Sequence, residues 1–215
     1  MQSSQNKLLI PLDGAPVIVY SLKVFIQSPL VEEVILVVPP EKKEEYQQTL
    51  SPYLAGKKEI GFVDGGKRRQ DSVWNGLKAV SPRSDVVVVH DGARPFVTEA
   101  MIRDSVAAAL EVGGSVVGVP CKSTLKECDE KQFVRRTPPR DRLWEIQTPQ
   151  TFQVPLLKQA FEEAHQKKLE VTDEGMLLEA LGHPVKVVLG EYTNIKVTTP
   201  EDLLLAELIL KRRNS

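Results

Sequence analysis

The chain has 215 residues, of which 28 are basic and 29 acidic, so its formal net charge is -1. This length suits a single domain, 1–215, with one sizeable core, and the balanced charge provides no field that would favour nucleic acid or an anionic membrane surface. No apolar run approaches the ~18 residues of a membrane span, and residues 1–7 lack the apolar core of a secretion signal, so we expect a cytoplasmic protein.

The first half of the chain alternates predicted helices with apolar strands. Apolar residues at helical spacing predict a helix over 15–27, which Pro16 is placed to start. Runs of β-branched residues at 34–38 and 86–89 predict strands that are buried on both faces of a parallel sheet. The remaining elements expected here are helices at 41–50, 70–80 and 99–111 and strands at 60–63 and 115–119.

The pattern changes at 121, and short polar segments up to about 150 predict an inserted arm. The alternation then returns, with helices expected at 155–166, 173–181 and 200–211 and strands at 185–189 and 194–197. Strands and helices that alternate without hairpin signals predict right-handed crossovers. We therefore predict an α/β, Rossmann-like fold with a mostly parallel sheet, helices on both faces and an inserted β-arm.

Ligands of an open parallel sheet bind beyond the carboxyl ends of its strands, so the residues after each apolar run are the first site candidates. Asp91 and Arg94 follow the run at 86–89. A carboxylate there can bind a ribose hydroxyl or a metal ion, and an arginine can grip a phosphate with its forked guanidinium. In the alternative interpretation, Asp91 caps the turn and Arg94 pairs with it. These two residues alone favour neither interpretation.

A glycine-containing loop follows another of the expected strands. Gly65 and Gly66 allow the backbone to approach a ligand, the amino end of the next helix favours an anion, and three cations at 67–69 reinforce it. The loop matches neither the dinucleotide fingerprint nor the phosphate loop of the common NTPases. The alternative is a solvated basic turn before a helix whose first turn holds Asp71 and Ser72.

Two further segments carry candidate residues. Lys196 is expected in a short strand, where its ammonium could neutralise developing phosphate charge, although a solvent-facing strand lysine is the commoner case. Residues 172–174 read Thr-Asp-Glu and could simply cap the helix that they begin. No nucleophile with an adjacent base is recognisable, so the residues favour direct displacement at phosphorus, where positioning and charge neutralisation supply most of the rate.

Several motifs, taken in chain order, form a pattern that is specific to one family. The two most specific motifs are His90-Asp91-Gly92-Ala93-Arg94-Pro95 and the segment 194–203, Asn-Ile-Lys-Val-Thr-Thr-Pro-Glu-Asp-Leu. The other matching segments are Pro11-Leu12 with Gly14 and Pro16, 63–66 with 70–73, Arg140 with Leu143-Trp144, 147–150 and 172–174. Over almost its whole length the chain resembles the 2-C-methyl-D-erythritol 4-phosphate cytidylyltransferases of the non-mevalonate isoprenoid pathway.

The resemblance implies cytidylyl transfer from CTP to 2-C-methyl-D-erythritol 4-phosphate, a small polyol phosphate, with release of pyrophosphate. It implies catalytic roles for Lys7 and Lys196, which flank the CTP phosphates. The CTP-binding residues that it implies are Gly65, Gly66, Ser72 and Asp91, with Asp91 also beside a bound Mg²⁺. The implied substrate-binding residues are Arg94, Thr124, Arg140, Thr172 and Lys196.

The resemblance also implies a homodimer. In this family the arm crosses a twofold axis, so Thr124 and Arg140 would serve the neighbouring subunit's pocket. Members of this family open with a strand and a glycine-rich loop, and Met1 falls on the last residue of that loop. We therefore expect about 20 more residues upstream, the length of one strand plus one loop. Without that strand, a hydrophobic slot would be exposed in the sheet.

Three other functions stay open on the sequence alone. A sister cytidylyltransferase that acts on ribitol 5-phosphate shares the fold and several motifs. A nucleotide-binding module without catalysis would be favoured if the chain really begins at Met1. A dinucleotide-dependent oxidoreductase is disfavoured by the absent glycine fingerprint.

Overall fold

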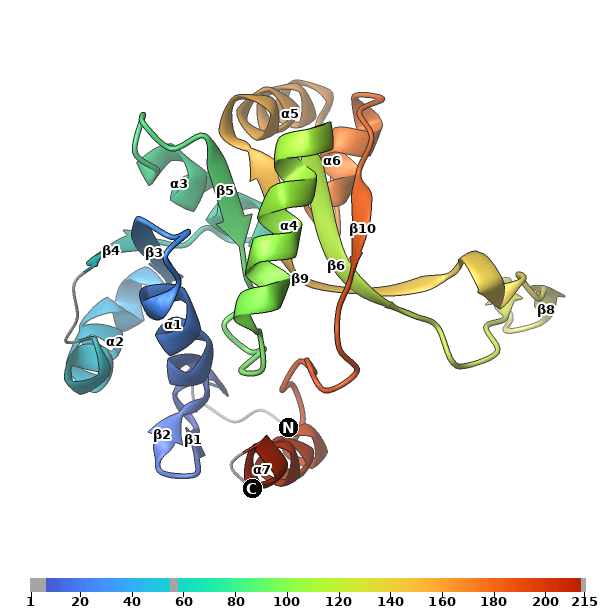
Figure 1. Cartoon of the computed structure of the whole chain (residues 1–215). Coiled ribbons are helices and arrows are strands. Elements are labelled where there is room, and N and C mark those ends of the chain that lie inside the picture. The colour runs from blue at the N-terminus through green and yellow to red at the C-terminus, as the bar shows by residue number, and fades with distance from the viewer. Residues whose placement is uncertain (1–6, 55–57, 214–215) are drawn as a thin grey trace.

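The computed structural model describes residues 7–54 and 58–213 (Figure 1). Its helices are α1 (Val17–Gln27), α2 (Lys43–Leu50), α3 (Arg69–Ala79), α4 (Glu99–Val112), α5 (Val154–Lys167), α6 (Gly175–Ala180) and α7 (Pro200–Arg213). Its strands are β1 (Pro11–Leu12), β2 (Ala15–Pro16), β3 (Glu33–Val38), β4 (Glu59–Asp64), β5 (Val86–Val89), β6 (Gly114–Pro120), β7 (Glu127–Cys128), β8 (Val134–Arg136), β9 (Trp144–Gln153) and β10 (Lys186–Leu189). Among the described residues, none of the helices has the length and apolar composition needed to cross a membrane.

Helices cover both faces of a central sheet whose strand order is β10-β6-β9-β5. Because side chains alternate along a strand, neighbouring residues of β6 face opposite ways. Val116 packs with α3, α5 and α6 around Phe152 and Phe161, whereas Val117 packs with α1 and α4 around Phe25 and Ile102. The predicted α/β class with a two-sided helical cover is thereby confirmed.

The strand β9 is a feature that the sequence analysis did not predict. We assigned residues up to about 150 to the arm, but 147–152 are buried in the middle of the sheet, and β9 runs antiparallel to both β5 and β6. The polar side chains and Pro149 of this segment are atypical of a central strand, because a proline has no N–H to donate to a neighbouring strand. Pro149 lies where the pairing with β6 shifts register between Val116 and Gly118, so its missing N–H is tolerated.

An apolar cavity of about 450 Å³ lies between β3 and β5. Within the described part of the chain β3 pairs only with β4, in parallel, and β5 pairs only with β9. Residues 86–89 are therefore only partly buried, whereas we expected them to be buried on both faces. This cavity is the hydrophobic slot that we expected in the sheet. The expected upstream extension stays a prediction, and Met1 lies outside the described residues.

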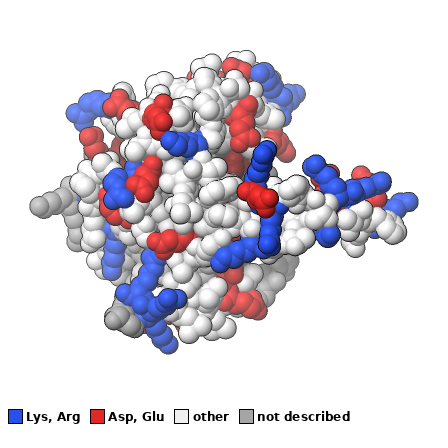
Figure 2. All heavy atoms as spheres, turned by 45° about the vertical axis from the view of Figure 1, so that its right-hand side comes forward, with Lys and Arg blue, Asp and Glu red and all other residues white. Residues whose placement is uncertain are grey.

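The segment 121–143 leaves the body as a long projection, with β7 and β8 paired antiparallel near its tip (Figure 1). Both strands are exposed throughout, and the side chains of Phe133 and Val134 are 69% and 56% exposed. We call this projection, residues 121–143, the arm. Figure 2 shows that Lys and Arg side chains gather along it.

Candidate active site

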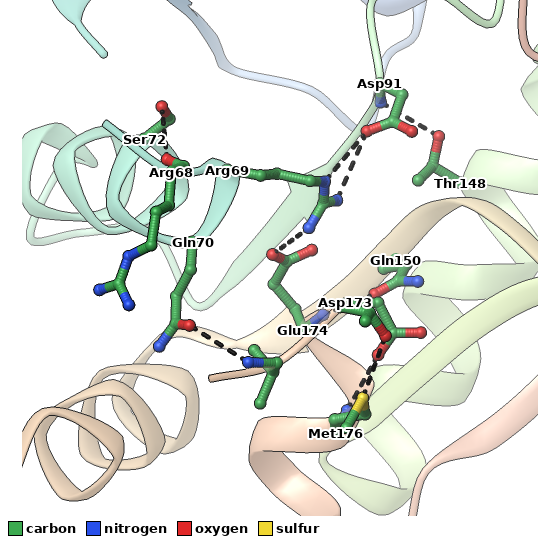
Figure 3. A network of polar contacts seen from close by, with 12 residues as sticks. Arg68, Arg69, Gln70, Ser72, Asp91, Thr148, Gln150, Asp173, Glu174 and Met176 are labelled. Atoms are coloured by element: carbon green, nitrogen blue, oxygen red, sulfur yellow. Dashed lines mark hydrogen bonds and ion pairs between the residues drawn. The ribbon is translucent and has the colours of Figure 1, made fainter. Parts of the chain in front are cut away.

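The Asp91 carboxylate is the centre of a cluster of charged side chains beyond the carboxyl end of β5. One of its oxygens, Oδ2, lies 2.7 Å from Lys196 Nζ. The other, Oδ1, accepts hydrogen bonds of 3.4 Å from both Nε and Nη2 of Arg69, in the first turn of α3 (Figure 3). Burial alone would raise the pKa of the Asp91 carboxyl, but the Lys196 ammonium and the Arg69 guanidinium outweigh it and lower that pKa.

Backbone hydrogen bonds bring Lys196 to Asp91. The Arg94 N–H donates to the Asp91 carbonyl at 2.9 Å and closes a tight turn after β5. The Val197 N–H then donates to the Ala93 carbonyl at 2.8 Å and ties the following loop to this turn. The strand that we predicted at 194–197 does not form, because this single bond is not continued into a ladder.

Hydrogen bonds of the His90 and Thr148 side chains hold the turn that follows β5. The Asp91 N–H donates to Thr148 Oγ1 at 3.1 Å, Thr148 Oγ1 lies 3.0 Å from His90 Nδ1, and His90 Nε2 lies 3.0 Å from the Arg94 carbonyl oxygen. A carbonyl only accepts, so Nε2 carries the proton and Nδ1 accepts from the Thr148 hydroxyl. Burial lowers the pKa of His90 to about 4, which keeps this imidazole neutral.

Arg94 does not pair with Asp91, which contradicts one of the two alternatives drawn from the sequence. Its Nη1 donates to the Asn194 carbonyl at 2.7 Å, and its buried Nε has no hydrogen-bond partner among the described residues. Burial lowers the pKa of this guanidinium. A partly buried guanidinium with an unpaired Nε beside Asp91 is suited to binding an anion.

Lys7 lies on the same side of the molecule as Lys196. It begins a short 3-10 helix, Lys7–Leu9, and its Nζ donates to the Thr198 carbonyl at 3.0 Å. That carbonyl is two residues beyond Lys196 in the loop that is tied to the Asp91 turn. The structure thus brings together the two lysines for which we expected catalytic roles.

The loop between β4 and α3 packs closely against the first turn of α3. The Gly65 N–H donates to the Val38 carbonyl at 2.8 Å, and the Gly66 N–H donates to Ser72 Oγ at 3.0 Å. A Cβ on Gly66 would lie 2.3 Å from Asp71 Cβ, so this position requires glycine. Asp71 also accepts from the Arg68 N–H, as expected of a residue in the first turn.

The segment 172–174 directly precedes α6 and reaches the charged cluster through Glu174. Asp173 Oδ1 accepts from the Met176 N–H at 3.0 Å, but the N-cap residue of α6 is Glu174, whose side chain makes no capping bond. The exposed Thr172 hydroxyl contacts the Met176 sulfur at 3.2 Å. Glu174 points the other way and pairs with Arg69.

Comparison with known proteins identifies the family of this chain. The family model described as IspD, 2-C-methyl-D-erythritol 4-phosphate cytidylyltransferase, matches residues 1–212. The chain belongs to this family. A protein of that name from Alkaliphilus oremlandii is 44% identical over 213 residues, which cover 99% of this chain and 90% of the relative. One from Bacillus velezensis is 45% identical over 212 residues, with coverages of 98% and 90%.

Solved structures of the family share the fold. A crystal structure of 4-diphosphocytidyl-2C-methyl-D-erythritol synthase from Anaerococcus prevotii matches with a TM-score of 0.88 at 33% identity, covering 95% of this chain and 93% of the other. A 2-C-methyl-D-erythritol 4-phosphate cytidylyltransferase from Thermus thermophilus matches with a TM-score of 0.78 at 32% identity, covering 95% and 94%. As a member of this family, the chain is a nucleotidyltransferase.

Thr124 and Arg140 are predicted site residues that lie outside the cluster in this single chain. Both are exposed on the arm, which projects away from the body. Arg140 Nη1 donates to the Lys122 carbonyl at 3.0 Å. Their expected role in a neighbouring subunit's pocket stays a prediction.

The donor set around Asp91 limits the metal that it can hold. No group of three or more His, Cys, Asp or Glu side chains in the described part of the chain could bind a metal by itself. Mg²⁺ needs no such cage, because it commonly takes one or two carboxylates and completes its shell with waters and substrate phosphates. A single carboxylate at a phosphate site therefore fits Mg²⁺.

Arg69 and Glu174 are members of the cluster that we did not predict. Arg69 was treated only as one of three consecutive cations, and Glu174 only as part of a capping motif. The signal that distinguishes them is contact between distant segments, since 105 residues separate the two partners. A single sequence carries no such signal.

Proposed function

We propose that this chain transfers the cytidylyl group of CTP to 2-C-methyl-D-erythritol 4-phosphate and releases pyrophosphate. The observation that carries the proposal is the meeting of Lys196, Asp91 and Arg94 beyond the end of β5, with Lys7 beside the same loop, in a chain of this family. The product would be 4-diphosphocytidyl-2-C-methyl-D-erythritol.

The reaction is one displacement at the α-phosphorus of CTP. A phosphate oxygen of the acceptor forms the new bond to this phosphorus, and the bond to the bridging oxygen of the β-phosphate breaks. Pyrophosphate leaves with that bonding pair. Lys7 and Lys196 would lie on either side of the phosphates and offset the charge that grows on them, so they are the proposed catalytic residues.

The nucleotide is proposed to bind along the loop between β4 and α3. Gly65 and Gly66 keep the backbone free of side chains there, and Ser72 fixes the loop to the helix through its hydroxyl. Asp91 would accept from a ribose hydroxyl and would hold Mg²⁺, the proposed cofactor. When bound, a divalent cation offsets negative charge on the triphosphate.

The polyol phosphate is proposed to lie on the other side of Asp91, between Arg94, Thr172 and Lys196. Arg94 supports this placement because its buried Nε has no protein partner within the described residues. Thr124 and Arg140 would complete the pocket from the arm of a second subunit, which makes a homodimer the proposed state. The exposed apolar side chains of the arm favour such a contact.

Pyrophosphate release tests the proposal directly. We expect release from CTP in the presence of 2-C-methyl-D-erythritol 4-phosphate and much less with ribitol 5-phosphate or without acceptor, and we expect chelation of divalent ions to stop it. Faster turnover with ribitol 5-phosphate would assign the sister activity instead. Calorimetric CTP binding without any release would indicate a binding module. A cytoplasmic location, proposed from the sequence, is tested by cell fractionation.

A further inference from the structure

Glu174 and Arg69 form an ion pair in which the glutamate is buried and the arginine is partly exposed. The Glu174 side chain has no exposed surface, and its Oε1 lies 2.5 Å from Arg69 Nη1. Its other oxygen, Oε2, is buried without a hydrogen-bond partner among the described residues, and burial raises the pKa of the carboxyl. A charge held in this way is unfavourable to folding unless its partner is well placed. The pair therefore differs from an ordinary solvent-exposed ion pair, and its position calls for a structural or functional reason.

Arg69 divides its guanidinium between two carboxylates. Nη1 binds Glu174, while Nε and Nη2 both point to Oδ1 of Asp91 (Figure 3). Asp91 consequently has two cationic neighbours of different kinds. Lys196 belongs to a loop and its side chain is 43% exposed, whereas Arg69 is fixed at its far end by a buried anion.

The pair is not needed to join α3 to the segment before α6. Gln70 already makes that connection, because its Nε2 donates to the Leu169 carbonyl at 3.2 Å and its Oε1 accepts from the Val171 N–H at 3.3 Å. Gln70 is itself buried. What Arg69 and Glu174 add is a fixed connection to Asp91.

We propose that Arg69, anchored by Glu174, is a positioning residue that holds the Asp91 carboxylate and so allows Lys196 to leave it for the phosphates of CTP. This inference rests on the proposed function. Without Arg69, Asp91 would keep Lys196 as its remaining bonded cation, and the lysine would be withheld from the transition state. Glu174 acts through Arg69, since the structure gives it no direct contact with Asp91.

A double-mutant cycle on Arg69→Gln and Glu174→Gln tests the proposal by steady-state kinetics with CTP and 2-C-methyl-D-erythritol 4-phosphate. We expect Arg69→Gln to lower kcat about 10- to 100-fold, the loss typical of a small misplacement of reacting groups, with a smaller change in KM for CTP. Glu174→Gln should lower kcat less. The double variant should be no worse than Arg69→Gln, because Glu174 has no role once its partner is gone.

Glu170→Gln is the matched control. Glu170 forms the neighbouring ion pair between the same two segments, with Arg68, but its side chain is 76% exposed and no hydrogen bond or ion pair joins it to Asp91. This variant should keep the kcat of the parent chain. Thermal unfolding of every variant separates loss of folded enzyme from loss of turnover.

The outcomes are distinct. Pyrophosphate release that is absent even in the parent chain would overturn the proposed function and this inference together. An active parent with a folded Arg69→Gln variant of near-normal kcat would overturn the inference alone, and so would losses that multiply in the double variant. If Glu174→Gln fails to fold, Arg69→Gln decides by itself, since that side chain is 36% exposed at the start of a helix.

Discussion

Lys196 Nζ lies 2.7 Å from Oδ2 of Asp91, yet the lysine side chain is 43% exposed. An ammonium on a flexible stem can exchange a carboxylate for a phosphate that gains charge during the reaction. We therefore expect Lys196→Ala to lower kcat by about 100- to 1000-fold, as loss of one preorganised electrostatic contact does, with a smaller effect on KM. Lys186→Ala, which removes an exposed lysine paired with Glu111, is the control and should leave kcat unchanged. Near-normal turnover of Lys196→Ala would refute the catalytic role.

His90 makes a second prediction at the residue scale, because its hydrogen bonds require a neutral ring. Its pKa is about 4 in the folded chain and 6.5 when unperturbed, so between these values the unfolded chain binds the proton and the folded chain does not. Stability contributed by His90 is therefore complete above pH 6.5 and is lost as the pH falls towards 4. NMR titration of the imidazole, assigned with a His90→Gln variant, should show protonation near pH 4. A midpoint near 6.5 would contradict the neutral, hydrogen-bonded ring.

Single residues also show how far the sequence could predict the site. Asp91 and Lys196 were predicted because each follows or precedes a recognisable element, and the motifs around them are specific to the family. Their 2.7 Å contact depends on the backbone bond from Val197 to Ala93, which no local pattern encodes. The same holds for Arg69, whose importance arises only from its two distant carboxylate partners.

At the scale of elements, continuous β-branched runs predicted β3 and β5, whereas β9, which has no such run, was missed. β3 and β5 owe their structure to local composition, so periodicity finds them. β9 is a strand because the sheet needs a partner between β5 and β6, and its buried Gln147 and Gln150 bond to other segments. Tertiary context of this kind overrides intrinsic strand preference.

The loop from β4 into α3 gives a prediction about an element. Gly66→Ala places a Cβ 2.3 Å from Asp71 Cβ, so the loop must move away from the helix or carry strain of about 1–3 kcal/mol. Because we place CTP on this loop, we expect its KM to rise about 10-fold, which corresponds to about 1.4 kcal/mol. Gly61→Ala in β4 is the matched control, since the nearest atom to its new Cβ is 3.9 Å away. Equal KM values for the two variants would exclude CTP from the loop.

At the scale of the whole molecule, the arm projects from the body, and its two strands pair only with each other within the described residues. The exposed antiparallel pair β7–β8 and the neighbouring Phe133 gain little stability from their own contacts. Arg140 belongs to the same arm, which projects away from the body. A twofold partner would cover the apolar residues and place Arg140 at a second cluster. The dimer and the shared pocket are thus one hypothesis, so a single experiment can test both.

Subunit mixing is that experiment. Arg140→Ala and Lys196→Ala should each inactivate a homodimer, because every pocket then lacks one residue. If each pocket takes Lys196 from one subunit and Arg140 from the other, half of the dimers in an equal refolded mixture are mixed, and each has one intact pocket. Activity should then recover to about one quarter of that of the parent chain, as a symmetric twofold dimer requires. Pockets built from one subunit would give no recovery. Mixing Lys196→Ala with Arg94→Ala is the control, because both residues belong to the same subunit's cluster and no combination restores a pocket.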